Sequence, residues 1–122
     1  MVFERLSEHG CDIEGTMKRF MGKRELYCRC LCSFITDETM NEIEDAFGKA
    51  HIRQLAEAVH RMKGISGNLG FSVLHTITSD MTTLFRADRH EEAVGKMPEL
   101  REAYKAIMTI LKENEEELGW TR

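Results

Sequence analysis

The stretch that decides the fold runs from Ile52 to Gly70 and reads IRQLAEAVHRMKGISGNLG. This spacing of apolar residues, in alternating steps of three and four, is typical of a helix that turns one face towards a bundle core. Gly70 follows the last apolar position and is expected to end the helix. The apolar positions are Leu55, Val59, Met62, Ile65 and Leu69.

The same spacing predicts helices on both sides of this stretch. Residues before Gly10 form a polar lead-in, and Asp12 is a candidate N-cap. Pro98 interrupts the last helical region, and we expect it either to kink that helix or to begin a new one. The predicted helices are 12–21, 23–34, a segment from the Thr36-Asp37 cap to Gly48, 52–69, a segment capped by Ser72 and reaching Phe85, and 91 to 117.

Short polar connections between amphipathic helices predict antiparallel neighbours, so we expect an all-α, up-and-down bundle. One proline, two tyrosines and one tryptophan argue against a β-sandwich or barrel. We interpret the eight methionines as core residues. The expected organisation is a single domain over residues 1–122, with 114–122 as a solvated tail.

The size and charge of the chain exclude several functions. A chain of 122 residues has no room for a kinase core or a hydrolase. Its formal charge of -4 and the lack of a basic run argue against nucleic acid and anionic membranes as partners. The charged N-terminus is unlike a signal peptide, and no apolar stretch is long enough to span a membrane. These features predict a cytoplasmic protein.

The face of 52–69 opposite the apolar stripe carries His60, with Lys63 and Gly64 one turn later and Gly67 two turns later. A glycine inside a helix costs about 1 kcal/mol relative to alanine, and this helix holds two on one strip. We infer that a partner approaches closely beside His60. Lys63 would supply a positive charge for an anion on the imidazole.

The segment from His60 to Gly70 resembles the H-x-L-K-G-x-x-x-x-L-G signature of histidine-containing phosphotransfer domains. Residues 12–20, Glu25 to Tyr27 and Phe34 are similar to the first two helices of that family, so the resemblance covers about residues 10–113. It implies a four-helix bundle with additional short N-terminal helices. It also implies a phosphorelay protein that accepts a phosphoryl group from one receiver-domain aspartate and passes it to another.

The resemblance also implies roles for individual residues. His60 would take the phosphoryl group on Nε2, Lys63 would balance its charge, and Gly64 would keep the approach open. The chain would be a carrier without a kinase core, with receiver domains and a hybrid histidine kinase as partners. It would need no cofactor, because the Mg²⁺ would belong to the receiver. Ser66, Gly67 and Asn68 would shape the surface around His60.

Two positions depart from the family pattern. Where the family often has a Gln or Glu that bonds the second ring nitrogen, this chain has Thr82, and Ser79 or Thr78 could take that role instead. His51 replaces the usual capping Asp, which should weaken the helix start by about 1 kcal/mol.

The contact surface for a receiver is expected to surround His60 and to include apolar residues, because neutral contacts hold a partner that charges only steer. The candidates are Ile13, Met17 and Phe71. A working surface of this kind is compatible with a monomer. Two alternatives remain open: an adaptor that binds without being phosphorylated, and the phospho-accepting domain of a larger chemotaxis-type or hybrid kinase.

Other patterns in the sequence carry weaker signals. Glu57 and His60 match one half of a di-iron motif, but there is no second copy, so no metal site is expected. Cys28, Cys30 and Cys32 cannot wrap one ion from a single helix, and we interpret them as reduced, partly buried thiols. His9, His75 and His90 have no evident chemical partner.

Overall fold

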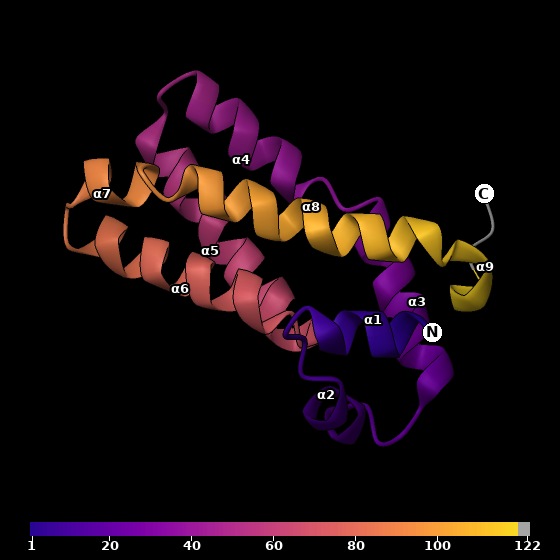
Figure 1. The fold of residues 1–122 in the computed structure, drawn as a ribbon. Helices are drawn as coiled ribbons and strands as arrows, with labels where there is room; N and C mark the ends of the chain where they lie inside the picture. Colours follow the sequence, from indigo (N-terminus) through magenta and orange to yellow (C-terminus); the bar gives the residue numbers. More distant parts are fainter. Residues whose placement is uncertain (120–122) are drawn as a thin grey trace.

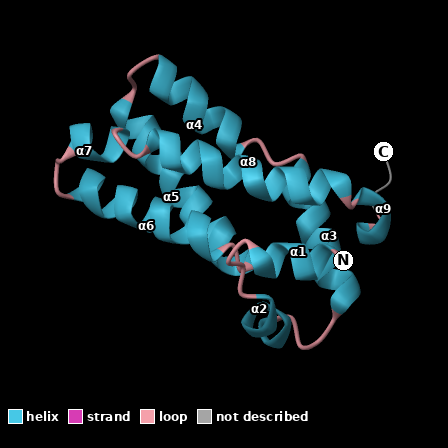
Figure 2. Cartoon of the chain, in the orientation of Figure 1, coloured by secondary structure: helices cyan, strands magenta, loops and turns pink. Residues whose placement is uncertain are grey.

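The structure is a computed structural model that describes residues 1–119 (Figure 1). Within this range the chain is helical and contains no strand (Figure 2). The helices are α1 (Val2–Glu8), α2 (Ile13–Arg19), α3 (Arg24–Ile35), α4 (Thr39–Gly48), α5 (Ile52–Leu69), α6 (Ser72–Arg86), α7 (His90–Val94), α8 (Met97–Glu113) and α9 (Glu115–Leu118).

Four of the helices, α4, α5, α6 and α8, form an up-and-down antiparallel bundle, which confirms the predicted fold class (Figure 1). Each packs against the next, and an ion pair joins the last helix to the first: both Nε and Nη2 of Arg101 donate to the Glu44 carboxylate at 2.8 Å. Helices α1, α2 and α9 gather at one end of the bundle, and α7 lies at the other.

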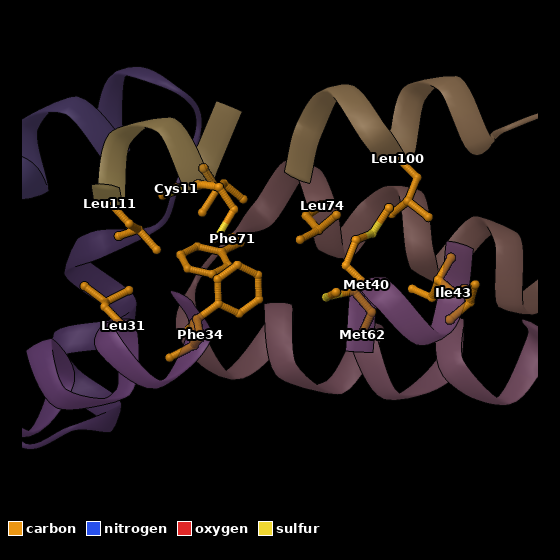
Figure 3. Packing of buried hydrophobic residues seen from close by; sticks show 14 of the residues in the cluster. Cys11, Leu31, Phe34, Met40, Ile43, Met62, Phe71, Leu74, Leu100 and Leu111 are labelled. Carbon is orange, nitrogen blue, oxygen red and sulfur yellow. The ribbon is translucent and has the colours of Figure 1, made fainter. Parts of the chain in front are cut away.

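The buried hydrophobic residues form one cluster that runs along the molecule (Figure 3). In the bundle, Met40 and Ile43 of α4 and Met62 of α5 lie close to Leu74 and Leu100. At the other end, α3 supplies Leu31 and Phe34, and the Phe34 ring meets the Phe71 ring edge-on at 5.0 Å between centroids. The interpretation of the methionines as core residues is wrong for Met1 and Met21, which are exposed, and is confirmed for the buried Met40, Met62, Met81, Met97 and Met108.

The ends of the helices follow from local chemistry. Asp12 caps α2 by accepting a hydrogen bond from the Gly15 N–H at 3.0 Å, as predicted. Gly70 ends α5 with a φ of +79°, which an L side chain rarely adopts. Pro98 lies in the first turn of α8, so it begins a helix and does not kink one. His51 stands at the N-cap of α5 without a side-chain hydrogen bond.

Three expectations about helix boundaries were wrong. The lead-in is a helix, α1, because Val2 and Leu6 lie one turn apart and both are fully buried. Ser72 is the first residue of α6 and not its cap, and Phe71 holds the cap position. Part of the expected solvated tail forms α9, where Leu118 is buried. The remaining tail residues, 120–122, lie outside the described range.

The free cysteines include two buried thiols, Cys11 and Cys28, and two half-buried ones, Cys30 and Cys32. Burial raises the pKa of Cys11 to about 11 and also raises the pKa values of Cys28 and Cys32. A thiol with a raised pKa is a poor nucleophile and a poor metal ligand at neutral pH, which agrees with the structural interpretation.

Tyr27 connects α3 to the end of α5. It is fully buried, and its hydroxyl donates to the Leu69 carbonyl at 2.8 Å. Burial raises its pKa, so the hydroxyl keeps its proton and remains a donor. Because Leu69 is in the last turn of α5, this bond satisfies a carbonyl that has no partner within the helix.

We predict that Tyr27→Phe lowers the free energy of unfolding by about 1–3 kcal/mol, because a buried carbonyl loses its donor. Urea unfolding followed by circular dichroism measures the change. Tyr104→Phe is the matched control, since Tyr104 is half-buried and its hydroxyl has no hydrogen bond in the described part of the chain. Equal losses in the two variants would contradict a specific role for the Tyr27 bond.

Candidate functional site

Helix α5 presents His60 on the face that points away from the core. His60 is exposed, whereas Val59 and Met62 beside it are fully buried, so the prediction of an outward His60 is confirmed. The pattern of α5 explains this, because the buried positions recur with the period of the helix and His60 lies opposite them. The same strip carries Lys63, Gly64, Gly67 and Asn68, all exposed or half-buried.

These residues meet around a hollow of ≈ 520 Å³, which we call the cationic hollow. No Asp or Glu of the described chain lines it, although the protein as a whole is acidic. Two cations beside an exposed imidazole, without a carboxylate to neutralise them, favour the binding of an anion. The hollow is lined by Arg19, His60, Lys63, Gly64, Gly67, Asn68 and His75.

A second hollow of ≈ 420 Å³, which we call the Thr82 hollow, also has His60 in its wall. Thr82 comes from α6 and is only 4% exposed. Its Oγ1 is buried and has no hydrogen-bond partner among the described residues. The other two candidates for orienting the imidazole line neither hollow: Ser79 is half-buried, and Thr78 is buried with its hydroxyl donating to the Leu74 carbonyl. The hollow is lined by Ala56, Glu57, His60, Arg61, Thr82, Phe85 and Arg86.

The two glycines of the motif have different surroundings. A Cβ added to Gly64 would meet nothing within 4 Å, so the space beside it is open to a partner, as expected. A Cβ added to Gly67 would lie 2.9 Å from Cε1 and Nδ1 of His75. The lack of a side chain at Gly67 therefore makes room for the His75 ring. The inference that both glycines clear the surface for a partner therefore stays a prediction for Gly64, whereas the fold itself explains Gly67.

His75 has a partner that the sequence did not reveal. Its Nδ1 lies 2.9 Å from the Lys63 carbonyl oxygen, and because a carbonyl only accepts, the proton is on Nδ1. The contact links α6 to α5 beside the cationic hollow. The expectation that His75 lacks a chemical partner was wrong, because the pairing joins residues on different helices and leaves no local signal.

Arg19, at the end of α2, is the second residue that sequence reasoning missed. Its Nη2 donates to the carbonyl oxygens of Gly67 at 3.0 Å and Asn68 at 3.3 Å, and to Thr16 Oγ1 at 3.0 Å. Cations are favourable at the C-terminal end of a helix, where the dipole is negative. The motif lies 41 or more residues further along the chain, so no spacing rule connects it with Arg19.

The three residues expected in the contact surface have different positions. Ile13 and Met17 on α2 are half-buried and pack against the core with part of their surface free. Phe71 is fully buried against Phe34, so its assignment to an exposed contact surface was wrong. Phe71 follows the chain reversal at Gly70, and its amide donates back to the Ser66 carbonyl, which turns the side chain inwards.

Two features are absent from residues 1–119, the range that the structure describes. No group of three or more His, Cys, Asp or Glu side chains in that range could hold a metal ion. No helix in that range has the length and apolar character needed to cross a membrane.

Residues 36–110 match the model of the family described as the Hpt domain. The match begins after α3, so the likeness inferred for residues 10–35 lies outside it. Neither a curated protein nor a solved structure matches the chain significantly. The family match spans more than half of the chain and includes the whole motif of α5. The chain therefore belongs to the Hpt domain family, and membership implies a phosphotransfer role in two-component signalling.

Proposed function

We propose that this protein carries phosphoryl groups between receiver-domain aspartates in a multistep phosphorelay, with His60 as the acceptor. The observation that carries the proposal is the exposed His60 beside Lys63, on the wall of a hollow that no carboxylate of the described chain lines. Lys63 and Arg19 attract an anion on that side of the imidazole, while Glu57, which lines the Thr82 hollow with His60, is paired with Arg53 at 3.7 Å. The donor would be a receiver domain phosphorylated by a hybrid histidine kinase.

The phosphoryl transfer needs no general base, because the attacking nitrogen carries no proton. The lone pair of His60 Nε2 attacks the phosphorus of the aspartyl phosphate, the N–P bond forms, and the P–O bond to the aspartyl carboxylate breaks. The carboxylate leaves as an anion, and the imidazole proton stays on Nδ1. Phosphoryl transfer depends mainly on positioning and on neutralising the equatorial oxygens. Lys63 contributes one positive charge, and the receiver contributes its own Mg²⁺.

Thr82 is the residue we propose for orienting the imidazole. An acceptor beside Nδ1 fixes the proton there and leaves Nε2 free as the nucleophile. The Oγ1 of Thr82 is buried in a wall that it shares with His60 and has no partner in the described chain, so its acceptor capacity is free. A half-buried Ser79 away from this wall is a weaker choice.

The approach of the receiver uses the open side of α5. Gly64 leaves space beside His60, and the partly exposed Ile13 and Met17 of α2 offer apolar contact area. Gly67 and Asn68 complete the wall of the cationic hollow. A receiver seated on this surface places its phosphoaspartate above His60 without displacing a side chain at Gly64.

His60→Gln is expected to abolish the transfer of phosphate from a labelled receiver domain, because the nucleophile is lost. Lys63→Ala should slow transfer by roughly 10- to 100-fold, the effect of one charge-assisted hydrogen bond. His51→Gln is the matched control for the first, since His51 is exposed on the same helix. Acid-labile phosphate on the His60 variant, or an unchanged rate in the Lys63 variant, would refute the respective assignment.

Gly64→Ala is expected to raise the free energy of unfolding by up to about 1 kcal/mol, because the new Cβ meets nothing and alanine favours the helix. Gly64→Gln should keep the fold but block transfer by obstructing the receiver. Gly48→Gln is the control, since Gly48 is also helical with open space around its Cβ. Parental transfer rates in the Gly64→Gln variant would show that the receiver approaches elsewhere.

Thr82→Val is expected to keep the fold intact, because a methyl group fills the space of a buried hydroxyl that no described residue bonds. It should also reduce the fraction of His60 with the proton on Nδ1, measured from ¹⁵N shifts of the imidazole, and slow transfer. Thr78→Val is the control and should destabilise, because the Thr78 hydroxyl donates to the Leu74 carbonyl at 2.8 Å. A Thr82→Val variant with parental ¹⁵N shifts would exclude the orienting role.

A further inference from the structure

Arg19 is a cation that the family match does not include, since the match begins at residue 36. Three acceptors hold one of its amino groups: Nη2 donates to Thr16 Oγ1 and to the carbonyls of Gly67 and Asn68. These bonds fix the guanidinium at the end of α5 before any partner arrives. A side chain fixed in this way loses little further entropy when it binds.

The other two nitrogen atoms of the Arg19 guanidinium are available as hydrogen-bond donors. Nε and Nη1 of Arg19 have no hydrogen-bond partner in the described part of the chain, and no carboxylate there lies within 4.0 Å as an ion pair. Its neighbour Lys18 differs, because it pairs with Glu14 at 3.7 Å. Arg19 therefore presents unused donors and a net positive charge to the cationic hollow.

Distance along α5 separates the role of Arg19 from that of Lys63. Arg19 binds the carbonyl of Gly67, which at about 1.5 Å per residue lies roughly 10 Å along the helix from His60. Lys63 is one turn from His60. Lys63 is therefore closer along the helix to a phosphoryl group on the imidazole, while Arg19 lines the cationic hollow from the end of α5.

We propose that Arg19 is a specificity-determining residue that binds a carboxylate on the rim of the incoming receiver domain. This inference rests on the proposed phosphotransfer function. The fork of donors on a guanidinium suits a carboxylate, and a charge at the edge of an interface mainly changes the association rate and its dependence on salt. The contact adds α2 to the surface that selects the partner.

The test uses the full chain and the receiver domain that binds it most tightly among a panel of purified receivers. Arg19→Met should raise the dissociation constant and the KM for transfer about tenfold, as expected for one charge-assisted contact. The kcat and the lifetime of the phosphohistidine should stay near parental values, and the salt dependence of binding should weaken. Arg19→Lys should recover most of the affinity at low salt, because it restores the charge. Lys18→Met is the matched control and should bind as the parent does.

Other results would overturn the proposal in distinct ways. A fall in kcat or in phosphohistidine lifetime without a change in KM would place Arg19 on the phosphoryl group. Equal weakening by Arg19→Met and Arg19→Lys at all salt concentrations, together with a lower unfolding midpoint, would make Arg19 only a cap for α5. The binding measurement tests the role of Arg19 even if His60 accepts no phosphate. A receiver that binds without transferring phosphate would therefore contradict the phosphotransfer function and not the contact of Arg19. Failure of every receiver in the panel to bind would contradict both.

Discussion

The carbonyl groups at the C-terminal end of α5 are the constraint on which the rest of the structure depends. A helix end leaves carbonyls without intrahelical donors, and burying them unpaired is costly. Three N-terminal segments supply donors: Tyr27 binds the Leu69 carbonyl at 2.8 Å, Arg19 binds the two carbonyls before it, and the Asp12 amide binds the Gly70 carbonyl at 2.8 Å. The helix that carries His60 is therefore fixed at one end by α2, α3 and the turn before α2.

This arrangement makes the candidate site a composite of two parts of the chain. The family match contains His60, Lys63 and the glycines of α5, while Arg19 and the half-buried Ile13 and Met17 come from α2, outside the match. The part inside the family match contains the histidine motif. The N-terminal part is anchored to backbone carbonyls at the end of the same helix by the side chains of Tyr27 and Arg19 and by the amide of Asp12.

The sequence was sufficient for the bundle and for the outward face of α5, because both follow from the periodicity of apolar residues over long helices. It failed for α1 and α9, where short segments bury only two residues and one residue, too few to produce a periodic signal. Phe71 was misplaced because the left-handed Gly70 breaks the helical register just before it. His75 and Arg19 were missed since their partners lie 12 and 48 residues away, and such pairings are decided by tertiary packing.

Two positions where this fold departs from good packing lie beside His60, although similar departures occur elsewhere, at the helical Gly48 and at the buried Nδ1 of His90. Gly64 leaves open space where an alanine would stabilise the helix, and Thr82 keeps a buried hydroxyl without a partner where a valine would pack as well. Gly67 looks the same in the sequence, yet its missing side chain is explained within the fold by the His75 ring. Stable folds satisfy local and tertiary preferences together except at functional sites. The departures at Gly64 and Thr82 therefore agree with the motif, because both lie beside the imidazole that we propose as the phosphoryl acceptor.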